Sequence, residues 1–434
     1  MERSRRTHCL VALVVATLTV LLAACGAAQP SPNPPSTQTK PPPRQSATPP
    51  SASPSPAAST ADSLAFGQAL DQHSPFAAPA EGAQAGGLPE VQNAWLLLFP
   101  ELRHAPAPNW LQEGARVTYY GQSASLAQAA GENSVGSAGY LQCDLVALDE
   151  EAAVSSVKFY LSQGDGSATP SFVLPSLGLP GAGDYWLSPG VLMDAEDVAN
   201  DELIVLHMPT EVAGQTHSAV RFEYRPVGAV YVWMFDADSG VLLFYRHAIG
   251  EEGAAQLQVA DLTLVAQRQV SLPWYGRSVP AWATEGSVLR WEGAYTALVM
   301  GQPAGSFPYT VRAEALHSRS RWTEHQLTAS VAGQPQGVTW RVTGVAQLSD
   351  ALWLPPEAFS ALRGGQILDR DTVTGAQVAV SRPGDGTVVL TESGAAYYTA
   401  LAYDERDGVL VSMQQQISTG AAGSLVSLQL SARP

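Results

Sequence analysis

The feature that most constrains the fold is an internal repeat with a spacing of about 167 to 168 residues. The motif Trp-Leu-x-Pro occupies residues 186–189 and recurs at 353–356. Some fifty residues later, Phe235–Leu242 (FDADSGVL) recurs as Tyr403–Leu410 (YDERDGVL), and further on Leu257 and Leu262 correspond to Leu425 and Leu430. Because order, spacing and residue types agree, we interpret the chain as two copies of one domain.

Each copy has the residue pattern of β-strands. Apolar residues alternate with charged or polar ones at 220–225, 338–343 and 426–431, which predicts strands with one face exposed to solvent. Residues 231–235 and 398–403 are apolar on both sides, which predicts central strands that are covered by other elements. Turn signals recur roughly every eight to twelve residues without a helix-length spacer, which favours antiparallel meanders.

We therefore predict a mainly β protein, with two tandem copies of an antiparallel, curled, half-barrel-like sheet. A short covering helix is expected in each copy after the Trp-Leu-x-Pro motif, because proline is tolerated in the first turn of a helix. The first copy is expected over residues 89–272 and the second over 284–434. Residues 273–283, which include Pro273 and Pro280, form the expected junction.

The amino terminus has the pattern of an export signal. Arg3, Arg5 and Arg6 precede an uncharged apolar run from Cys9 to Ala24. This run is shorter than the ~20 residues that a membrane-spanning helix needs. A charged start, an apolar middle and small residues at the end are typical of a signal peptide.

The end of this signal, Leu22-Ala23-Ala24-Cys25, resembles the lipobox of bacterial lipoprotein signal peptides. The resemblance covers this segment alone. It implies cleavage between Ala24 and Cys25, a diacylglycerol thioether on Cys25, and acylation of the new amino group, for example with palmitate. Residues 1–24 would then be removed, and the mature protein would be anchored by lipid to the cell membrane, on its extracytoplasmic face. An ordinary signal peptide with an incidental cysteine is the alternative.

The residues after the lipobox have the composition of a tether. Residues 26–61 contain 11 Pro and 11 Ser or Thr but no aromatic residue. Such a segment buries too little apolar surface to offset the loss of chain entropy, so we expect residues 25–61 to form a disordered tether that begins at the lipidated cysteine. Residues 62–88 are expected to be flexible as well.

The charged and nucleophilic residues do not form a recognisable catalytic or metal-binding motif. Acidic residues outnumber basic ones by 39 to 23, and the formal net charge of −16 argues against nucleic acid as a partner. Three cysteines cannot form a disulfide framework. The eight histidines lack the spacings of known metal motifs. We therefore predict no enzymatic activity, no cofactor and no metal, although a site assembled from distant residues needs no local motif.

The repeated segment 236–240 offers oxygen ligands that superficially suit calcium. A calcium loop needs six to eight oxygen ligands, however, and Arg406 replaces the second acidic residue in the other copy. Asp followed four residues later by Gly is typical of a β-hairpin loop, because glycine adopts positive φ readily. We therefore predict that Asp236, Gly240, Asp404 and Gly408 are structural turn residues.

Tryptophan residues are frequent near the expected junction. Trp186 and Trp353 belong to the repeated motif, and we expect them to pack the helix on the sheet. Trp274, Trp282 and Trp291 surround the junction between the copies. They could fill an interdomain contact or form a platform on which a sugar ring stacks.

The order of a strand, an Asp-x-x-x-Gly hairpin and a returning strand, in a lipid-anchored exported protein, resembles the periplasmic lipoprotein-carrier group. That resemblance implies a half-barrel over a lipid-binding hollow, and hence a non-enzymatic binding protein for a lipid or other apolar ligand. No binding residue can be transferred from it. A cell-wall glycan- or protein-binding module and an envelope hydrolase are the alternatives, and a close-packed core is the alternative to the hollow.

Overall fold

The computed structural model describes residues 94–127, 133–163, 166–249, 256–419 and 421–433. The predicted signal peptide, the cleavage site at Ala24 and Cys25, the tether and residues 62–88 lie outside these ranges. Among the described residues, no helix has the length and apolar character required to cross a membrane.

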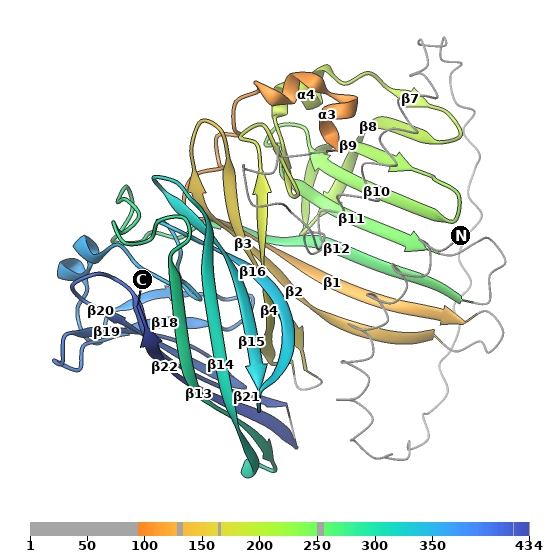
Figure 1. The fold of residues 1–434 in the computed structure, drawn as a ribbon. Helices are drawn as coiled ribbons and strands as arrows, with labels where there is room; N and C mark the ends of the chain where they lie inside the picture. Colours follow the sequence, from red (N-terminus) through yellow and green to blue (C-terminus); the bar gives the residue numbers. More distant parts are fainter. Residues whose placement is uncertain (1–93, 128–132, 164–165, 250–255, 420, 434) are drawn as a thin grey trace. The chain divides into compact units, whose positions relative to one another are not determined.

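The first sheet is built from ten antiparallel strands within the described residues (Figure 1). They are β1 (Ala115–Ala127), β2 (Asn133–Leu148), β3 (Ala153–Ser162), β4 (Ala168–Gly178), β7 (Val198–Ala199), β8 (Leu203–Val212), β9 (Gln215–Tyr224), β10 (Ala229–Asp236), β11 (Leu242–Ile249) and β12 (Gln256–Gln269). Their order is β4-β3-β2-β1-β12-β11-β10-β9-β8-β7. The first strand therefore lies in the middle of the sheet, paired with the last.

The second sheet repeats this topology, again with ten described strands. They are β13 (Val288–Val299), β14 (Gln302–Ser318), β15 (Trp322–Val331), β16 (Gln334–Gly344), β17 (Ile367–Arg370), β18 (Gln377–Ser381), β19 (Thr387–Gly394), β20 (Tyr397–Asp404), β21 (Leu410–Thr419) and β22 (Ala422–Ala432). Their order is β16-β15-β14-β13-β22-β21-β20-β19-β18-β17. The predicted fold class, two tandem antiparallel sheets, is confirmed.

Short elements cover the inner face of each sheet, by which we mean the face that carries its hydrophobic core. In the first copy these are α3 (Trp95–Leu98), the 3-10 helix η1 (Pro100–Arg103), the small hairpin β5 (Ala182–Gly183) and β6 (Trp186–Leu187), and α4 (Pro189–Asp194). In the second copy the 3-10 helix η2 (Pro356–Ala361) takes the place of α4. Both α4 and η2 start at the proline that ends the repeated motif, so the predicted short covering element is present in each copy.

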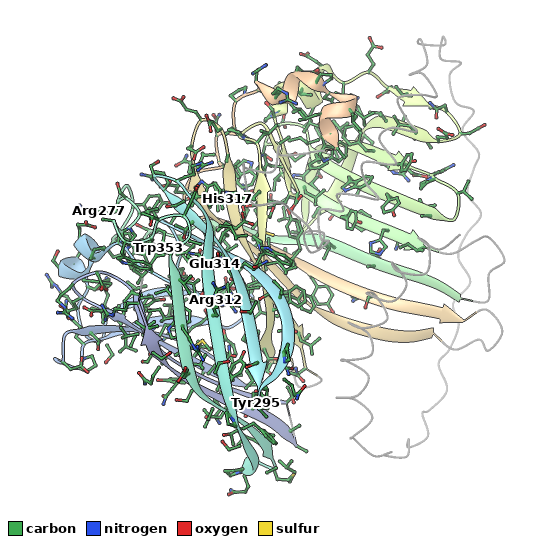
Figure 2. All side chains as sticks on the ribbon, in the orientation of Figure 1. Arg277, Tyr295, Arg312, Glu314, His317 and Trp353 are labelled. Carbon is green, nitrogen blue, oxygen red and sulfur yellow. The ribbon has the colours of Figure 1, made fainter. Side chains whose placement is uncertain are left out.

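The two repeated motifs are far apart in each copy but touch in the structure. Leu187 N–H donates to the Gly240 carbonyl (2.9 Å), and in the second copy Leu354 N–H donates to the Gly408 carbonyl (2.9 Å). Trp186 and Trp353 each form a β-bridge with the residue after that glycine, and both indoles are fully buried. Trp353 is labelled in Figure 2. The Trp-Leu segment therefore extends the hairpin by one short strand, which explains why both motifs recur together.

A third contact occurs within each copy. It joins the hairpin turn to a tryptophan that precedes the first strand of that copy. Trp110 Nε1–H donates to the Ser239 carbonyl (2.8 Å), and Trp282 Nε1–H donates to the Asp407 carbonyl (2.7 Å). These tryptophans precede β1 and β13 by similar distances in the sequence. The duplication therefore includes the segment before the first strand, which sequence comparison alone did not reveal.

The expected correspondence of Leu257 and Leu262 with Leu425 and Leu430 is wrong by two residues at both positions. Leu257 lies opposite Leu126, and the residue in the same place of the second sheet is Gly423, opposite Leu298. Leu262 lies opposite Gly121, and the residue in the same place of the second sheet is Leu428, opposite Gly293, rather than Leu430. Leu262 also pairs with Tyr245, 17 positions earlier, whereas Leu428 pairs with Met413, 15 positions earlier. The last strand is thus reached by a connection that is two residues shorter in the second copy, and a constant spacing cannot detect this.

Candidate functional site

The most distinctive surface of the molecule is a row of aromatic side chains on the inner face of the first sheet. We call Tyr224, Tyr231, Trp233, Tyr245 and His247 the aromatic row. Tyr224 is on β9, Tyr231 and Trp233 are on β10, and Tyr245 and His247 are on β11. Tyr231 lies directly opposite both Tyr224 and His247, and Trp233 lies opposite Tyr245, so all five side chains share one face.

The rings of the aromatic row are in contact with one another. Tyr231 and Trp233 have ring centroids 5.7 Å apart and nearly parallel planes (11°), and Tyr224 and Tyr231 are 6.4 Å apart at 25°. Tyr245 lies 5.6 Å from Trp233 and 5.8 Å from His247. Parallel rings at 5.7 Å form an offset stack, so Tyr231 and Trp233 turn a face toward each other.

Burial decreases along the row as it leaves the hydrophobic core. Trp233, Tyr245 and Tyr224 are buried, at 1%, 4% and 6% exposure, whereas Tyr231 and His247 are half-buried. Burial is the main cause that lowers the pKa of His247 below its ordinary value, so the neutral imidazole is favoured. The row therefore presents an apolar, uncharged surface at its outer end.

The same face continues as an apolar surface across the sheet to β4. Leu262 is half-buried next to Tyr245, and on the far side Phe159 stacks on Phe172 with centroids 5.1 Å apart. Phe172 is 45% exposed. Between these groups lies Gly121, which pairs with a second glycine, Gly139, on the neighbouring strand. The side chains of Leu262 and Phe159 close over these glycines, because a Cβ on Gly121 would lie 2.7 Å from Leu262 and one on Gly139 would lie 3.0 Å from Phe159.

The equivalent positions of the second sheet are different in character. Through the strand register, Tyr224, Tyr231, Trp233, Tyr245 and His247 correspond to Glu392, Thr399, Leu401, Met413 and Gln415. The second sheet has an apolar residue at only two of these five positions, Leu401 and Met413. The two copies therefore share a framework but not this surface.

The face of the second sheet is occupied by the outer face of the first. Lys158 on β3 donates to Glu392 (2.8 Å) and pairs with Asp350 (2.5 Å). The hydroxyls of Tyr160 and Tyr397 both donate to Glu392 (2.9 and 2.8 Å). Burial alone raises the pKa of Glu392, but the charge and hydrogen bond of Lys158 dominate and hold it at about 2. Glu392 is therefore a paired carboxylate rather than an open binding group.

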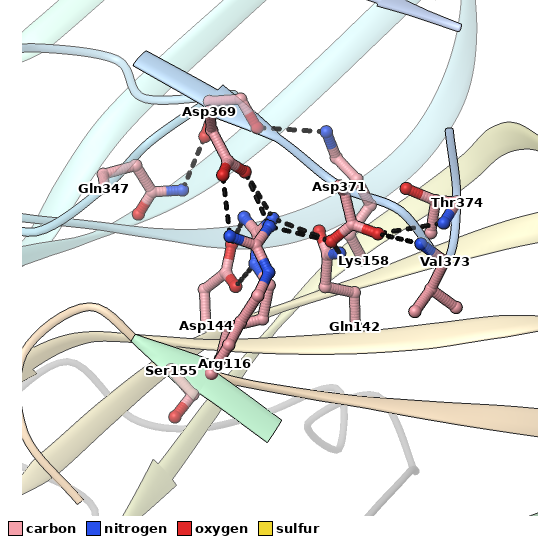
Figure 3. A network of polar contacts seen from close by, with 12 residues as sticks. Arg116, Gln142, Asp144, Ser155, Lys158, Gln347, Asp369, Asp371, Val373 and Thr374 are labelled. Atoms are coloured by element: carbon pink, nitrogen blue, oxygen red, sulfur yellow. Dashed lines mark hydrogen bonds and ion pairs between the residues drawn. The ribbon is translucent and has the colours of Figure 1, made fainter. Parts of the chain in front are cut away.

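A second cluster of charges joins the sheets nearby (Figure 3). Arg116 on β1 donates to Asp144 (2.5 and 2.7 Å) and to Asp369 (3.0 Å) and Asp371 (3.3 Å) of the second copy. Arg268 on β12 donates to the same Asp369 (2.7 Å) and Asp371 (2.9 Å). Arg116 is only 3% exposed. We call this cluster, together with the group around Lys158, the inter-sheet network.

These contacts give the two inner faces different roles. Apolar packing of Val146 and Val154 against Trp322 and Val342 adds to the inter-sheet network. The first sheet thus covers the inner face of the second with its own outer face. Its inner face, with the aromatic row, makes no such contact with the second sheet among the described residues, so it is the candidate ligand-binding surface.

The predicted turn residues lie in matching hairpins. Gly240 and Gly408 both have φ of +75°, and their N–H groups donate to the carbonyls of Asp236 (2.7 Å) and Asp404 (2.9 Å). The Asp236 carboxylate accepts from Ser239 N–H (3.0 Å), and that of Asp404 accepts from the N–H two residues later (2.9 Å). Among the described residues, no group of three or more His, Cys, Asp or Glu is placed to hold a metal ion. The absence of a metal role stays a prediction.

The junction tryptophans are largely enclosed. Trp274 and Trp291 are 0% and 2% exposed, and their indole N–H groups donate to the carbonyls of Gln347 (3.2 Å) and Leu410 (2.9 Å). Trp282 is half-buried. Buried rings cannot stack on a sugar, so this geometry favours the packing interpretation over the sugar platform for Trp274 and Trp291.

The strand at residues 231–235, over which the apolar hollow was expected, lines the hydrophobic core of the first copy. Trp233 and Phe235 belong to this core at 1% and 0% exposure, which favours the close-packed alternative at these two residues. Over the described residues, two open hollows, of about 390 and 280 Å³, flank the loop 105–107. Sequence periodicity identified the strand but could not show which elements cover it.

Comparison with known proteins gives little guidance. No family model and no curated protein matches the chain. Solved structures with some likeness include MucB in complex with MucA(peri) (11% identity, 77% of this chain and 92% of that chain, TM-score 0.19). Others are a protein of unknown function from the DUF3598 family of Nostoc punctiforme (9%, 72% and 95%, TM-score 0.13) and a putative AttH from Nitrosomonas europaea (10%, 81% and 99%, TM-score 0.16). At these TM-scores the likeness supports no functional argument.

Proposed function

We propose that this chain is a lipid-anchored, extracytoplasmic binding protein without catalytic activity, and that it binds a lipid or another apolar molecule at the outer end of the aromatic row, where Tyr231 and His247 are half-buried. The observation that carries the proposal is the contrast between the two copies. At five equivalent positions the first copy has a contiguous aromatic surface, whereas the second has a partly polar surface that is covered by the first sheet.

The chemistry of the aromatic row favours an apolar ligand over a sugar. A sugar stacks on the flat face of a ring, whereas Tyr231 and Trp233 turn a face toward each other. A fatty-acid chain that removes roughly 500 Å² of apolar area from water, counting both surfaces, gains about 12 kcal/mol. Association costs at least about 4 kcal/mol in lost freedom, so a dissociation constant near the micromolar range is expected.

Anchoring of this protein is supported by the sequence of the amino terminus. The lipobox at residues 22–25, the positive start and the tether at 25–61 agree with one another. Two or three acyl chains on Cys25 would hold the protein firmly, since each buried CH₂ contributes about 0.8 kcal/mol. As a flexible coil the tether spans roughly 35 Å, which keeps the folded part close to lipid molecules.

The proposal is tested by titrating the mature chain with cis-parinaric acid, a fluorescent fatty acid. Saturable binding is expected in the wild type, and Tyr231→Asp should weaken it at least tenfold because it places a carboxylate against the apolar ligand. Tyr398→Asp is the matched control, since Tyr398 is 44% exposed on the other sheet and should leave the affinity unchanged. Tyr231→Ser provides a milder change at the same position.

Two results would contradict the proposal. One is the absence of saturable binding in the wild-type chain and in every variant. The other is equal weakening by Tyr231→Asp and Tyr398→Asp, which would show that the probe binds elsewhere or unspecifically. Far-UV circular dichroism of each variant establishes that the sheets are intact.

A further inference from the structure

We propose that residues 64–76 of this same chain bind the aromatic row and compete there with the apolar ligand. The competition rests on the proposed function, whereas the docking of the segment does not. The inference identifies an intramolecular occupant for the outer end of the row, where Tyr231 and His247 are half-buried.

The described part of the chain begins next to the row. The described residues begin at Ala94, and Trp95 follows at once in α3 on the inner face of the first sheet. The Trp95 ring lies 5.4 Å from Trp233, a member of the aromatic row, and 5.0 Å from Phe222. Trp95 is only 5% exposed. The described residues therefore begin beside the aromatic row.

The preceding sequence contains a suitable apolar segment. Between residues 26 and 63 there is no Val, Ile, Leu, Met, Phe, Trp or Tyr. Leu64, Phe66, Leu70 and Phe76 then follow within 13 residues. Phe66 and Phe76 are the only Phe, Tyr or Trp residues between Cys25 and Trp95. This change of composition separates the segment from the tether, and apolar side chains of this kind gain free energy by burial.

The connection is long enough for the segment to reach every ring of the row. Eighteen positions separate Phe76 from Ala94, and an extended chain of that length spans up to about 60 Å. The row crosses three neighbouring strands, a distance of about 10 Å at the ordinary strand spacing. The equivalent face of the second sheet cannot be the docking site, because Lys158 and Tyr160 of the first sheet occupy it.

Docking of the segment would lower the apparent affinity for a ligand. A tethered segment acts at an effective concentration that can reach the millimolar range. If it occupies the row nine-tenths of the time, the apparent dissociation constant of the ligand rises about tenfold. Removing the apolar side chains of the segment should therefore strengthen binding of an external probe, without any change in the row itself.

Hydrogen–deuterium exchange of the mature chain tests the docking directly. Amides of residues 64–76 should exchange at least tenfold more slowly than those of residues 26–61. Tyr231→Ser, or the double variant Leu64→Ser/Phe66→Ser, should abolish that protection. The matched control is Val299→Ser/Met300→Ser, at two apolar residues of the β13–β14 hairpin that are 55% and 75% exposed, and it should leave the protection intact.

The same variants titrated with cis-parinaric acid separate the two proposals. Leu64→Ser/Phe66→Ser should lower the apparent dissociation constant about tenfold. Exchange in residues 64–76 as fast as in the tether, with probe affinity unchanged by the double variant, would overturn the inference and leave ligand binding standing. Protection that appears only at high protein concentration would also overturn it, because a second copy of the chain would then be the occupant. Protection in the absence of any probe binding would support the docking and contradict the proposed function.

Discussion

Gly408→Ala is predicted to destabilise the protein because two separate constraints act at that position. Gly408 has φ of +75°, a conformation that costs a residue with a Cβ about 1–2 kcal/mol. A Cβ placed there would also lie 1.9 Å from the Leu354 carbonyl oxygen, so the Trp-Leu segment has to move by more than 1 Å. That movement weakens the hydrogen bonds from Leu354 N–H to Gly408 and from Leu410 N–H to Leu352.

The expected magnitude follows from these parts. Two backbone hydrogen bonds contribute about 0.5–1.5 kcal/mol each, so together with the backbone strain Gly408→Ala should cost about 2–5 kcal/mol. Gly375→Ala is the matched control. Gly375 ends another Asp-x-x-x-Gly turn with φ of +73°, but nothing lies within 4 Å of its Cβ position, so only about 1–2 kcal/mol is expected. Urea unfolding followed by circular dichroism measures both. Equal losses for the two variants would refute the contribution of the contact with the Trp-Leu segment.

Three further predictions concern the inter-sheet network and the anchor. Lys158→Met should cost about 3–5 kcal/mol in the free energy of unfolding, because it leaves Glu392 buried without its cation. The control Arg312→Met, which breaks the exposed pair with Glu314 (Figure 2), should cost less than about 1 kcal/mol. Equal losses of the two variants in urea unfolding would contradict the cost expected for Lys158→Met. The pKa of Glu392 is lowered to about 2 in the folded protein from about 4.3 in the unfolded chain, so its contribution to stability is present above pH 4.3 and is lost as the pH falls toward 2, and unfolding midpoints that do not change over that interval would argue against this pairing. Cys25→Ser should block lipidation and release the protein from the membrane fraction, and normal cleavage with retention in that fraction would disprove the anchor.

Much of the fold was predictable because local periodicity reports local structure. Residues 220–225 alternate in the sequence, and the apolar members Val220, Phe222 and Tyr224 all lie in the first core. The internal repeat likewise predicted two similar sheets, because its two motifs form one contact that recurs in each copy. The Asp-x-x-x-Gly pattern could also have predicted the turn at 371–375, where Asp371 accepts hydrogen bonds from the backbone of its own turn.

The candidate site was only partly predictable, since it depends on pairing between distant strands. Residues 231–235 could be identified as an apolar strand, but not as the neighbour of Tyr224 and His247, because register is a tertiary property. The burial of Lys158 against the second sheet was also missed. One signal was present, since Lys158 is the only lysine after residue 40 in a chain whose other basic residues are arginines. A residue type that occurs only once in such a long stretch of chain is a reason to examine its environment.

The central claim is that the aromatic row binds the apolar ligand, and photo-crosslinking tests it most directly. The mature chain is incubated with a fatty acid that carries a diazirine near the end of its acyl chain, irradiated, digested and mapped by mass spectrometry. We predict that labels concentrate in peptides that cover Tyr224–Ile249, with weaker labelling around Phe159 and Phe172, and that unlabelled fatty acid competes with them. Labels confined to residues 288–432, or spread evenly without competition, would contradict the account.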